Sequence, residues 1–165
     1  MRLVVQRVEK AKVTQADSAK VLGEIGKGLF VLVGIKKGDS EKEAEVLAQK
    51  LSKLRVMGDT AGKMNLSVTD VGGKMLVVSQ FTLHADTKDG NRPSFINAEE
   101  PEKAEKLYEF FVKKLEECLR PIGPSFVPEE LKLRRTARRV ETGGFGDYMK
   151  IETVLDGPVT ILYSD

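Results

Sequence analysis

The chain has 165 residues, of which 41% are apolar and 32% charged, so it is long enough to bury a core, and one domain over residues 1–165 is expected. Its 27 basic and 25 acidic residues nearly cancel, so composition alone gives no reason to expect a nucleic-acid-binding protein. Because Cys118 is the only cysteine, neither an internal disulfide nor a cysteine-based zinc site is expected, which fits a reducing compartment.

The N-terminal third predicts strands followed by a helix. Residues 3–8 are rich in β-branched side chains and predict a strand, and residues 12–14 begin its partner. The run 29–35 is continuously apolar, as in a strand buried on both faces. Ser40 and Glu43 predict a capping box at a helix N-terminus. The helix that follows carries one apolar stripe, formed by Ala44, Leu47, Leu51 and Leu54.

The middle of the chain predicts a second buried strand and a second helix. A turn or loop is expected at residues 62–65, before an apolar strand over residues 74–80 that is followed by residues 81–85. Residues 86–94 are polar and predict a loop. Pro101 suits the first turn of a helix that continues to about Leu119.

The C-terminal part predicts an insert and two strands. Residues 121–139 contain three prolines and then a basic cluster, formed by Lys132, Arg134, Arg135, Arg138 and Arg139. Residues 142–146 predict a glycine-rich connector, and strands are expected over residues 149–154 and 158–163. With about six strands and two long helices, the expected fold class is mixed α/β, with helices on one side of a mixed sheet.

The residues offer little conventional catalytic machinery. Ser79, His84 and Asp86 suggest a hydrolase triad, but Ser79 and His84 would point to opposite faces of a regular strand. There is also no Gly-x-Ser-x-Gly turn around Ser79, so His84 is interpreted as an exposed strand residue. No metal site is expected, because there is one histidine, one cysteine and no metal-loop spacing of carboxylates.

The segment from Ser79 to Leu83 allows two interpretations. Its hydroxyl groups could satisfy backbone groups locally, which is the common role of Ser and Thr after a strand. Alternatively the strand end kinks and directs backbone N–H groups into a pocket, where they would stabilise the oxyanion of an acyl-transfer reaction. Thr82 could then orient water or substrate, or act as a nucleophile, although no neighbouring base would activate it.

The motifs together resemble the D-aminoacyl-tRNA deacylases over nearly the whole chain. The resemblance begins with residues 1–8 and continues through 62–65, 79–83 and 91–95 to residues 156–160. Five short motifs in the family's order make it specific. Two departures are Leu155, where the family has Asn, and the segment 121–139, which is longer than the family's connection.

The resemblance implies an enzyme that hydrolyses the ester between a D-amino acid, or glycine, and the terminal adenosine of tRNA, without a cofactor. It implies a homodimer with two β-layers and outer helices. The backbone N–H groups of Phe81 and Thr82 would hold the ester carbonyl, and Ser79, Gln80 and Leu83 would line the pocket.

A cross-subunit loop would supply stereospecificity in such an enzyme. The resemblance implies that Gly157 and Pro158 of the other subunit, joined by a cis peptide bond, exclude L-amino acids. The ribose 2′-hydroxyl of the tRNA would activate water or attack. Phe145 and Met149 are the candidates for packing against the terminal adenine.

Two alternatives remain open at this stage. The chain could be a non-catalytic tRNA- or RNA-binding module that uses the basic cluster between Lys132 and Arg139. It could also act mainly on glycine mischarged onto alanine tRNA, which changes the substrate and not the chemistry. The N-terminus lacks the features of a signal peptide and no apolar run would span a membrane, so a cytoplasmic protein is expected.

Overall fold

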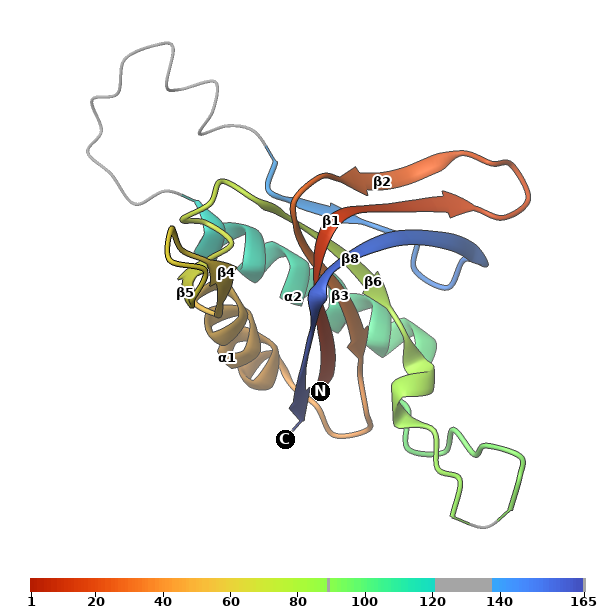
Figure 1. Ribbon diagram of the computed structural model, residues 1–165. Helices are drawn as coiled ribbons and strands as arrows, with labels where there is room; N and C mark the ends of the chain where they lie inside the picture. Colours follow the sequence, from red (N-terminus) through yellow and green to blue (C-terminus); the bar gives the residue numbers. More distant parts are fainter. Residues whose placement is uncertain (89, 121–137, 165) are drawn as a thin grey trace.

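The main sheet follows from the two buried apolar runs that the sequence indicates. The computed structural model describes residues 1–88, 90–120 and 138–164 (Figure 1). In chain order its elements are β1 (Arg2–Gln15), β2 (Val21–Ile25), β3 (Gly28–Gly34), α1 (Glu41–Ser52), β4 (Arg55–Gly58), β5 (Met64–Ser67), β6 (Lys74–Ser79), the 3-10 helix η1 (Phe81–His84), α2 (Pro101–Leu119), β7 (Val140–Thr142) and β8 (Met149–Ser164).

The strands form one mixed sheet and a small hairpin. The order in the sheet is β2-β1-β3-β6-β7, with β8 paired to β1, and the hairpin consists of β4 and β5. The pairs β3–β6 and β6–β7 are parallel, whereas β1 is antiparallel to all three of its neighbours. Parallel neighbours need long crossover connections, and α1 and α2 lie in these two crossovers. The predicted mixed α/β class is therefore confirmed.

The two faces of β3 and β6 bury different clusters because side chains alternate along a strand. Leu29, Val31, Met75 and Val77 belong to the larger cluster, which also contains the apolar stripes of both helices. Phe30, Leu76 and Val78 belong to a second cluster, with residues of β1 and β2. Both helices thus cover the same face of the sheet, as the sequence predicts (Figure 1).

Two strands are longer than the sequence pattern predicts. Residues 12–14 do not begin a partner strand but continue β1, and the segments 149–154 and 158–163 form the single strand β8. The β1–β8 pairing has register irregularities between Gln6 and Lys10. Such irregularities bend a strand and shift its alternation, so Val5 belongs to the larger cluster whereas Ala11, an even number of residues farther along β1, belongs to the second.

Local sequence signals predict the helices well and the short strands poorly. The capping box at Ser40 and Glu43 is present, and Pro101 occupies the first turn of α2. The strands β2, β4, β5 and β7 are not predicted, because each has only three to five residues and too few positions to show a period. No helix in the described ranges is long and apolar enough to cross a membrane.

Candidate active site

The chain leaves the sheet abruptly at the end of β6. The N–H of Gln80 still donates to Val33 O of β3 at 2.7 Å, and η1 then begins at Phe81. A 3-10 turn leaves the N–H groups of its first residues without partners inside the turn. The Gln80 side chain does not cap these groups and donates to the Thr82 hydroxyl instead. The kink that the sequence allowed as an alternative is therefore present.

A glycine in β3 lets η1 lie directly on the sheet. A Cβ at Gly34 would be 2.9 Å from the Leu83 Cβ and 3.1 Å from the His84 Nε2, so a larger residue would push the turn away. From β1, the Arg2 guanidinium donates to the Leu83 carbonyl. These contacts hold η1 from behind, while Phe81 and Thr82 at its start are exposed.

The prediction that His84 is an exposed strand residue is wrong. The strand ends at Ser79, so alternation no longer applies, and the turn places the imidazole inside with 7% of the residue exposed. Its Nε2 atom is buried and has no hydrogen-bond partner in the described part of the chain. Burial therefore lowers the pKa of His84, and the nearby positive charge of Arg2 acts in the same direction.

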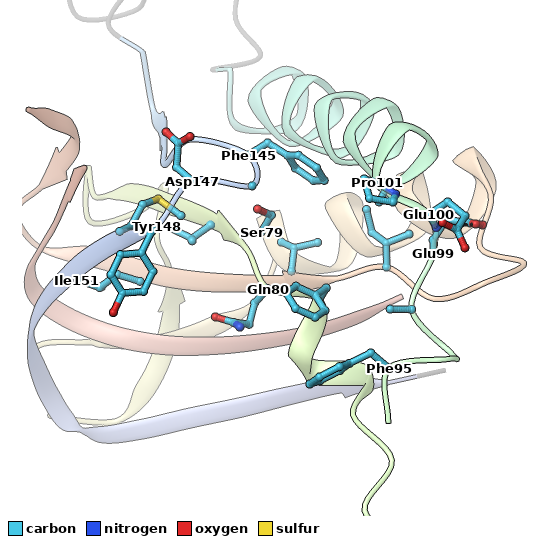
Figure 2. A pocket seen from close by; sticks show the side chains of 18 residues that line it. Ser79, Gln80, Phe95, Glu99, Glu100, Pro101, Phe145, Asp147, Tyr148 and Ile151 are labelled. Atoms are coloured by element: carbon cyan, nitrogen blue, oxygen red, sulfur yellow. Dashed lines mark hydrogen bonds between the residues drawn. The ribbon is translucent and has the colours of Figure 1, made fainter. Parts of the chain in front are cut away.

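A pocket of about 650 Å³ opens beside this turn (Figure 2). Of the predicted site residues, it is lined by Ser79, Gln80, Phe81, Phe145 and Met149. The first three end β6 and begin η1, whereas the last two lie on the connector before β8 and at its start. Thr82 and Leu83, which are also predicted site residues, are not part of this lining in the single chain.

Phe145 is held in place by packing against Tyr108 of α2. Its ring lies 5.7 Å from the ring of Tyr108, centroid to centroid, and the Tyr108 hydroxyl donates to Val77 O at 2.9 Å. Burial raises the pKa of Tyr108, so the hydroxyl stays protonated as a donor. The connector can approach Met149 closely because a Cβ at Gly143 would lie only 2.7 Å from the Met149 sulfur. The two predicted adenine contacts are therefore fixed by packing.

Several pocket residues were not predicted as site residues. They include Phe95, Glu99, Glu100, Asp147 and Tyr148. The Phe95 ring packs edge to face on Phe81, with centroids 5.0 Å apart. Phe95 lies in one of the recognised motifs, which is a signal that could have identified it. The others follow no local pattern that distinguishes them from surface residues.

Gly157 and Pro158 lie within β8, outside this pocket, and their peptide bond is cis. Gly157 has φ +131°, in the region that favours glycine. The side chain of Arg7 reaches the preceding residue: Nε donates to Asp156 O at 3.1 Å and pairs with the Asp156 carboxylate at 3.0 Å. Arg7 Nη1 donates to Val56 O of β4 at 2.7 Å. A charged residue inside the apolar strand 3–8 was the overlooked signal for this contact.

The described part of the basic cluster has a structural role. The N–H of Arg139 bonds to Glu116 at 3.3 Å, and its guanidinium reaches Gly73 O at 3.4 Å. Lys132, Arg134 and Arg135, like most of the predicted insert 121–139, lie outside the described residues. Within the described ranges, no three His, Cys, Asp or Glu side chains are grouped so that they could hold a metal ion.

The fold matches that of known proteins over nearly the full length of the chain. One solved structure, described as c-Myc DNA Unwinding Element Binding Protein, has a TM-score of 0.83 at 37% identity and covers 100% of this chain and 99% of its own. Another, described as a probable eukaryotic D-amino acid tRNA deacylase, has a TM-score of 0.78 at 14% identity, with 98% and 97% covered. The fold is thus that of a deacylase-like α/β protein.

The sequence comparisons identify the family. A family model described as D-Tyr-tRNA(Tyr) deacylase matches residues 4–164. The D-aminoacyl-tRNA deacylases of Paracoccus denitrificans and Thermosipho melanesiensis are 50% and 46% identical, each covering 98% of this chain and 95% of the relative. The chain belongs to the D-Tyr-tRNA(Tyr) deacylase family, and its identification from sequence as an enzyme of that family is confirmed.

We predict that His84 makes the protein less stable in mild acid. Its pKa is lowered on folding, so its contribution to the free energy of unfolding is complete above the unfolded pKa of about 6.5 and is lost as the pH falls through that value toward the folded pKa. Urea denaturation between about pH 7.5 and 5.5 should show this loss in the wild type and a weaker pH dependence in His84→Gln. Because His84 is the only histidine, its NMR titration is unambiguous, and a midpoint at or above 6.5 would contradict the prediction.

Proposed function

We propose that this chain is a D-aminoacyl-tRNA deacylase, which releases a free D-amino acid and tRNA by hydrolysing the ester at the terminal adenosine. The observation that carries the proposal is the family match, which spans residues 4–164 and includes every segment that lines the pocket. The names of the relatives describe the same activity. We further propose that residues 1–165 act as one domain, with residues 121–139 as an insert, in the cytoplasm.

The proposed reaction depends on backbone groups. The N–H groups of Phe81 and Thr82 would donate to the ester carbonyl and then to the oxyanion that forms on attack, which is worth about 3–4 kcal/mol for each well-placed donor. This assignment is supported by the exposed start of η1 beside the pocket and by the contacts of Gly34 and Arg2 that hold the turn from behind. Ser79, Gln80 and Leu83 would shape the pocket around the aminoacyl group.

We propose that the attacking water is activated by a group of the substrate. The one histidine is buried against Gly34, so it is not available as a general base at the surface of the pocket. A ribose 2′-hydroxyl adjacent to the ester can supply this role in the tRNA itself. With the terminal adenine between Phe145 and Met149, the ester would lie toward Phe81, which lines the same pocket. The substrate class is therefore RNA-linked esters and not free amino acid esters.

Stereospecificity would come from a second subunit. The strand β8 pairs only with β1 among the described strands, and it carries exposed apolar side chains, including Ile151, Val154, Leu155 and Leu162. An unpaired edge of this kind favours association with another chain. We propose a homodimer in which Gly157 and Pro158 of each subunit enter the partner's pocket. A rigid backbone beside the substrate Cα excludes an L side chain and admits a hydrogen atom or a D side chain.

The same exclusion mechanism would admit glycine. A filter that tests only the space on one side of the Cα has no means to reject an amino acid without a side chain. We therefore include glycine mischarged onto alanine tRNA among the proposed substrates. Leu155, where the family has Asn, is exposed on β8 two residues before Gly157, so it can alter how this loop is presented to the partner.

We predict that the purified protein releases D-tyrosine from D-tyrosyl-tRNA and leaves L-tyrosyl-tRNA intact. Release of radiolabelled amino acid under single-turnover conditions measures both rates. Binding of tRNA without release at any enzyme concentration would instead support the alternative, a non-catalytic RNA-binding module. The same assay on alanine tRNA that carries glycine shows which of the two substrates, this one or D-tyrosyl-tRNA, is cleaved faster.

We predict that Thr82→Ala retains activity. If the backbone N–H and not the hydroxyl acts on the carbonyl, kcat should fall less than about tenfold, compared with the 100- to 1,000-fold loss expected on removing an oxyanion donor. The Thr82 hydroxyl accepts a hydrogen bond from Gln80, so a modest loss from a less ordered turn is expected. A loss of several thousandfold in a folded variant would assign the hydroxyl a direct chemical role.

We predict that Gly157→Ala weakens the discrimination between D and L substrates. A Cβ there would lie 2.9 Å from both the N and the Cγ2 of Val159, and φ is +131°, so the segment must shift. We expect kcat/KM on D-tyrosyl-tRNA to fall by about 10- to 100-fold and the D-to-L ratio to narrow. Gly26→Ala is the matched control, because nothing lies within 4 Å of a Cβ at that position.

Sedimentation should give a dimer for the wild type and for both glycine variants. An unchanged D-to-L ratio in a folded, dimeric Gly157→Ala protein would show that this segment does not act as the stereospecific filter. A monomeric wild-type protein that still discriminates would overturn the cross-subunit arrangement.

A further inference from the structure

We propose that Tyr148 forms a second stacking subsite, which binds the base of the nucleotide that precedes the terminal adenosine. The proposal rests on the proposed function, since it requires the adenosine to occupy the pocket beside Phe145 and Met149. It assigns a role to a residue outside the recognised motifs. The ligand class is an unpaired RNA base, bound by its aromatic face.

Tyr148 combines unusual exposure with a fixed backbone. Although it lines the pocket, 82% of the residue is exposed, the largest fraction among the big apolar side chains of the described residues. Its carbonyl accepts a hydrogen bond from the N–H of Ala16 at 2.9 Å, and the next residue, Met149, pairs with Gln15 of β1. The backbone therefore holds Tyr148 at a defined position at the margin of the pocket.

No aromatic pair among the described residues accounts for the position of the ring. In the described ranges, the aromatic pairs are Phe81 with Phe95 and Tyr108 with Phe145, and neither includes Tyr148. A solvated tyrosine presents both a large apolar face and a hydroxyl, at low cost in conformational entropy. Such a face beside a nucleoside pocket is available to any base, because every base can stack on it.

The position of Tyr148 fits a ligand that continues out of the pocket. Tyr148 is three residues from Phe145, so their Cα atoms are at most about 10 Å apart, and an RNA chain held at Phe145 can reach the tyrosine. In Figure 2, Tyr148 and Ile151 lie at one end of the pocket, and Glu99 and Glu100 at the other. The carboxylates would repel the phosphates of an RNA chain, so the chain is expected to leave at the tyrosine end.

The neighbouring carboxylate does not block this subsite. Asp147 precedes Tyr148, but in Figure 2 the two side chains point in opposite directions from the connector. The Asp147 carboxylate folds back over Gly144, where a Cβ would lie 2.1 Å from its Oδ2. Tyr148 thus offers a neutral aromatic face, and the contact should depend on stacking more than on phosphate charge.

The test compares two small substrates that differ only in the preceding nucleotides. One is D-tyrosyl-adenosine and the other is the same ester on the trinucleotide CCA. We expect the wild type to prefer the trinucleotide in kcat/KM, and Tyr148→Ala to reduce this preference by about 5- to 150-fold, which is the range for losing one base–aromatic stack. Tyr148→Phe keeps the ring and should keep the preference.

Two further variants serve as controls for misfolding and for nonspecific effects of losing an exposed apolar side chain. Tyr148→Leu retains apolar bulk without an aromatic face, so it should lose the preference even if Tyr148→Ala does not fold. Val46→Ala removes an exposed apolar side chain from α1, away from the pocket, and should keep the preference.

Three outcomes overturn the subsite. In the first, the wild type cleaves both esters equally. In the second, Tyr148→Ala and Tyr148→Leu lower both rates by the same factor. In the third, these variants become monomers in sedimentation, which would assign Tyr148 to a subunit interface. If the wild type cleaves neither of the two small esters nor D-tyrosyl-tRNA, the proposed function itself is refuted.

Discussion

The close approach of η1 to Gly34 is the contact on which the candidate site depends. β3 and β6 are parallel neighbours, so the chain leaving β6 passes over the end of β3, and only a residue without a side chain lets the turn lie there. The side chains of Leu83 and His84 face Gly34 from the turn, and the Arg2 guanidinium donates to the Leu83 carbonyl. The start of η1, whose N–H groups the proposed mechanism uses, is consequently held by a support that cannot easily shift.

A second element fixes the opposite wall. Phe145 rests on Tyr108 of α2, and that tyrosine is bonded to the backbone of β6, the strand that leads into η1. Both walls of the pocket are therefore anchored to β6. In the proposed mechanism this site contributes position, and the reactive hydroxyl belongs to the substrate.

The β8 strand shows how one element serves two proposed purposes. Its first residues close the pocket of their own subunit, whereas Gly157 and Pro158 lie farther along, outside that pocket. Arg7 connects the segment before Gly157 to β4, which ties the proposed filter to the body of the subunit that supplies it. A filter that must stay rigid while contacting another molecule needs such an anchor, since its own residues are exposed.

The sequence by itself determined the family, both helices, the capping box of the first, the buried strands and five of the residues that line the pocket. These features are encoded in contiguous motifs or in helical and strand periods, which survive without knowledge of the fold. Only the tertiary structure decided that β1 and β8 are single long strands, that His84 is buried, and that Tyr148 and Glu99 border the same pocket as Ser79. Each of these depends on contacts between residues distant in the chain, and local periodicity carries no information about which distant surface a residue will meet.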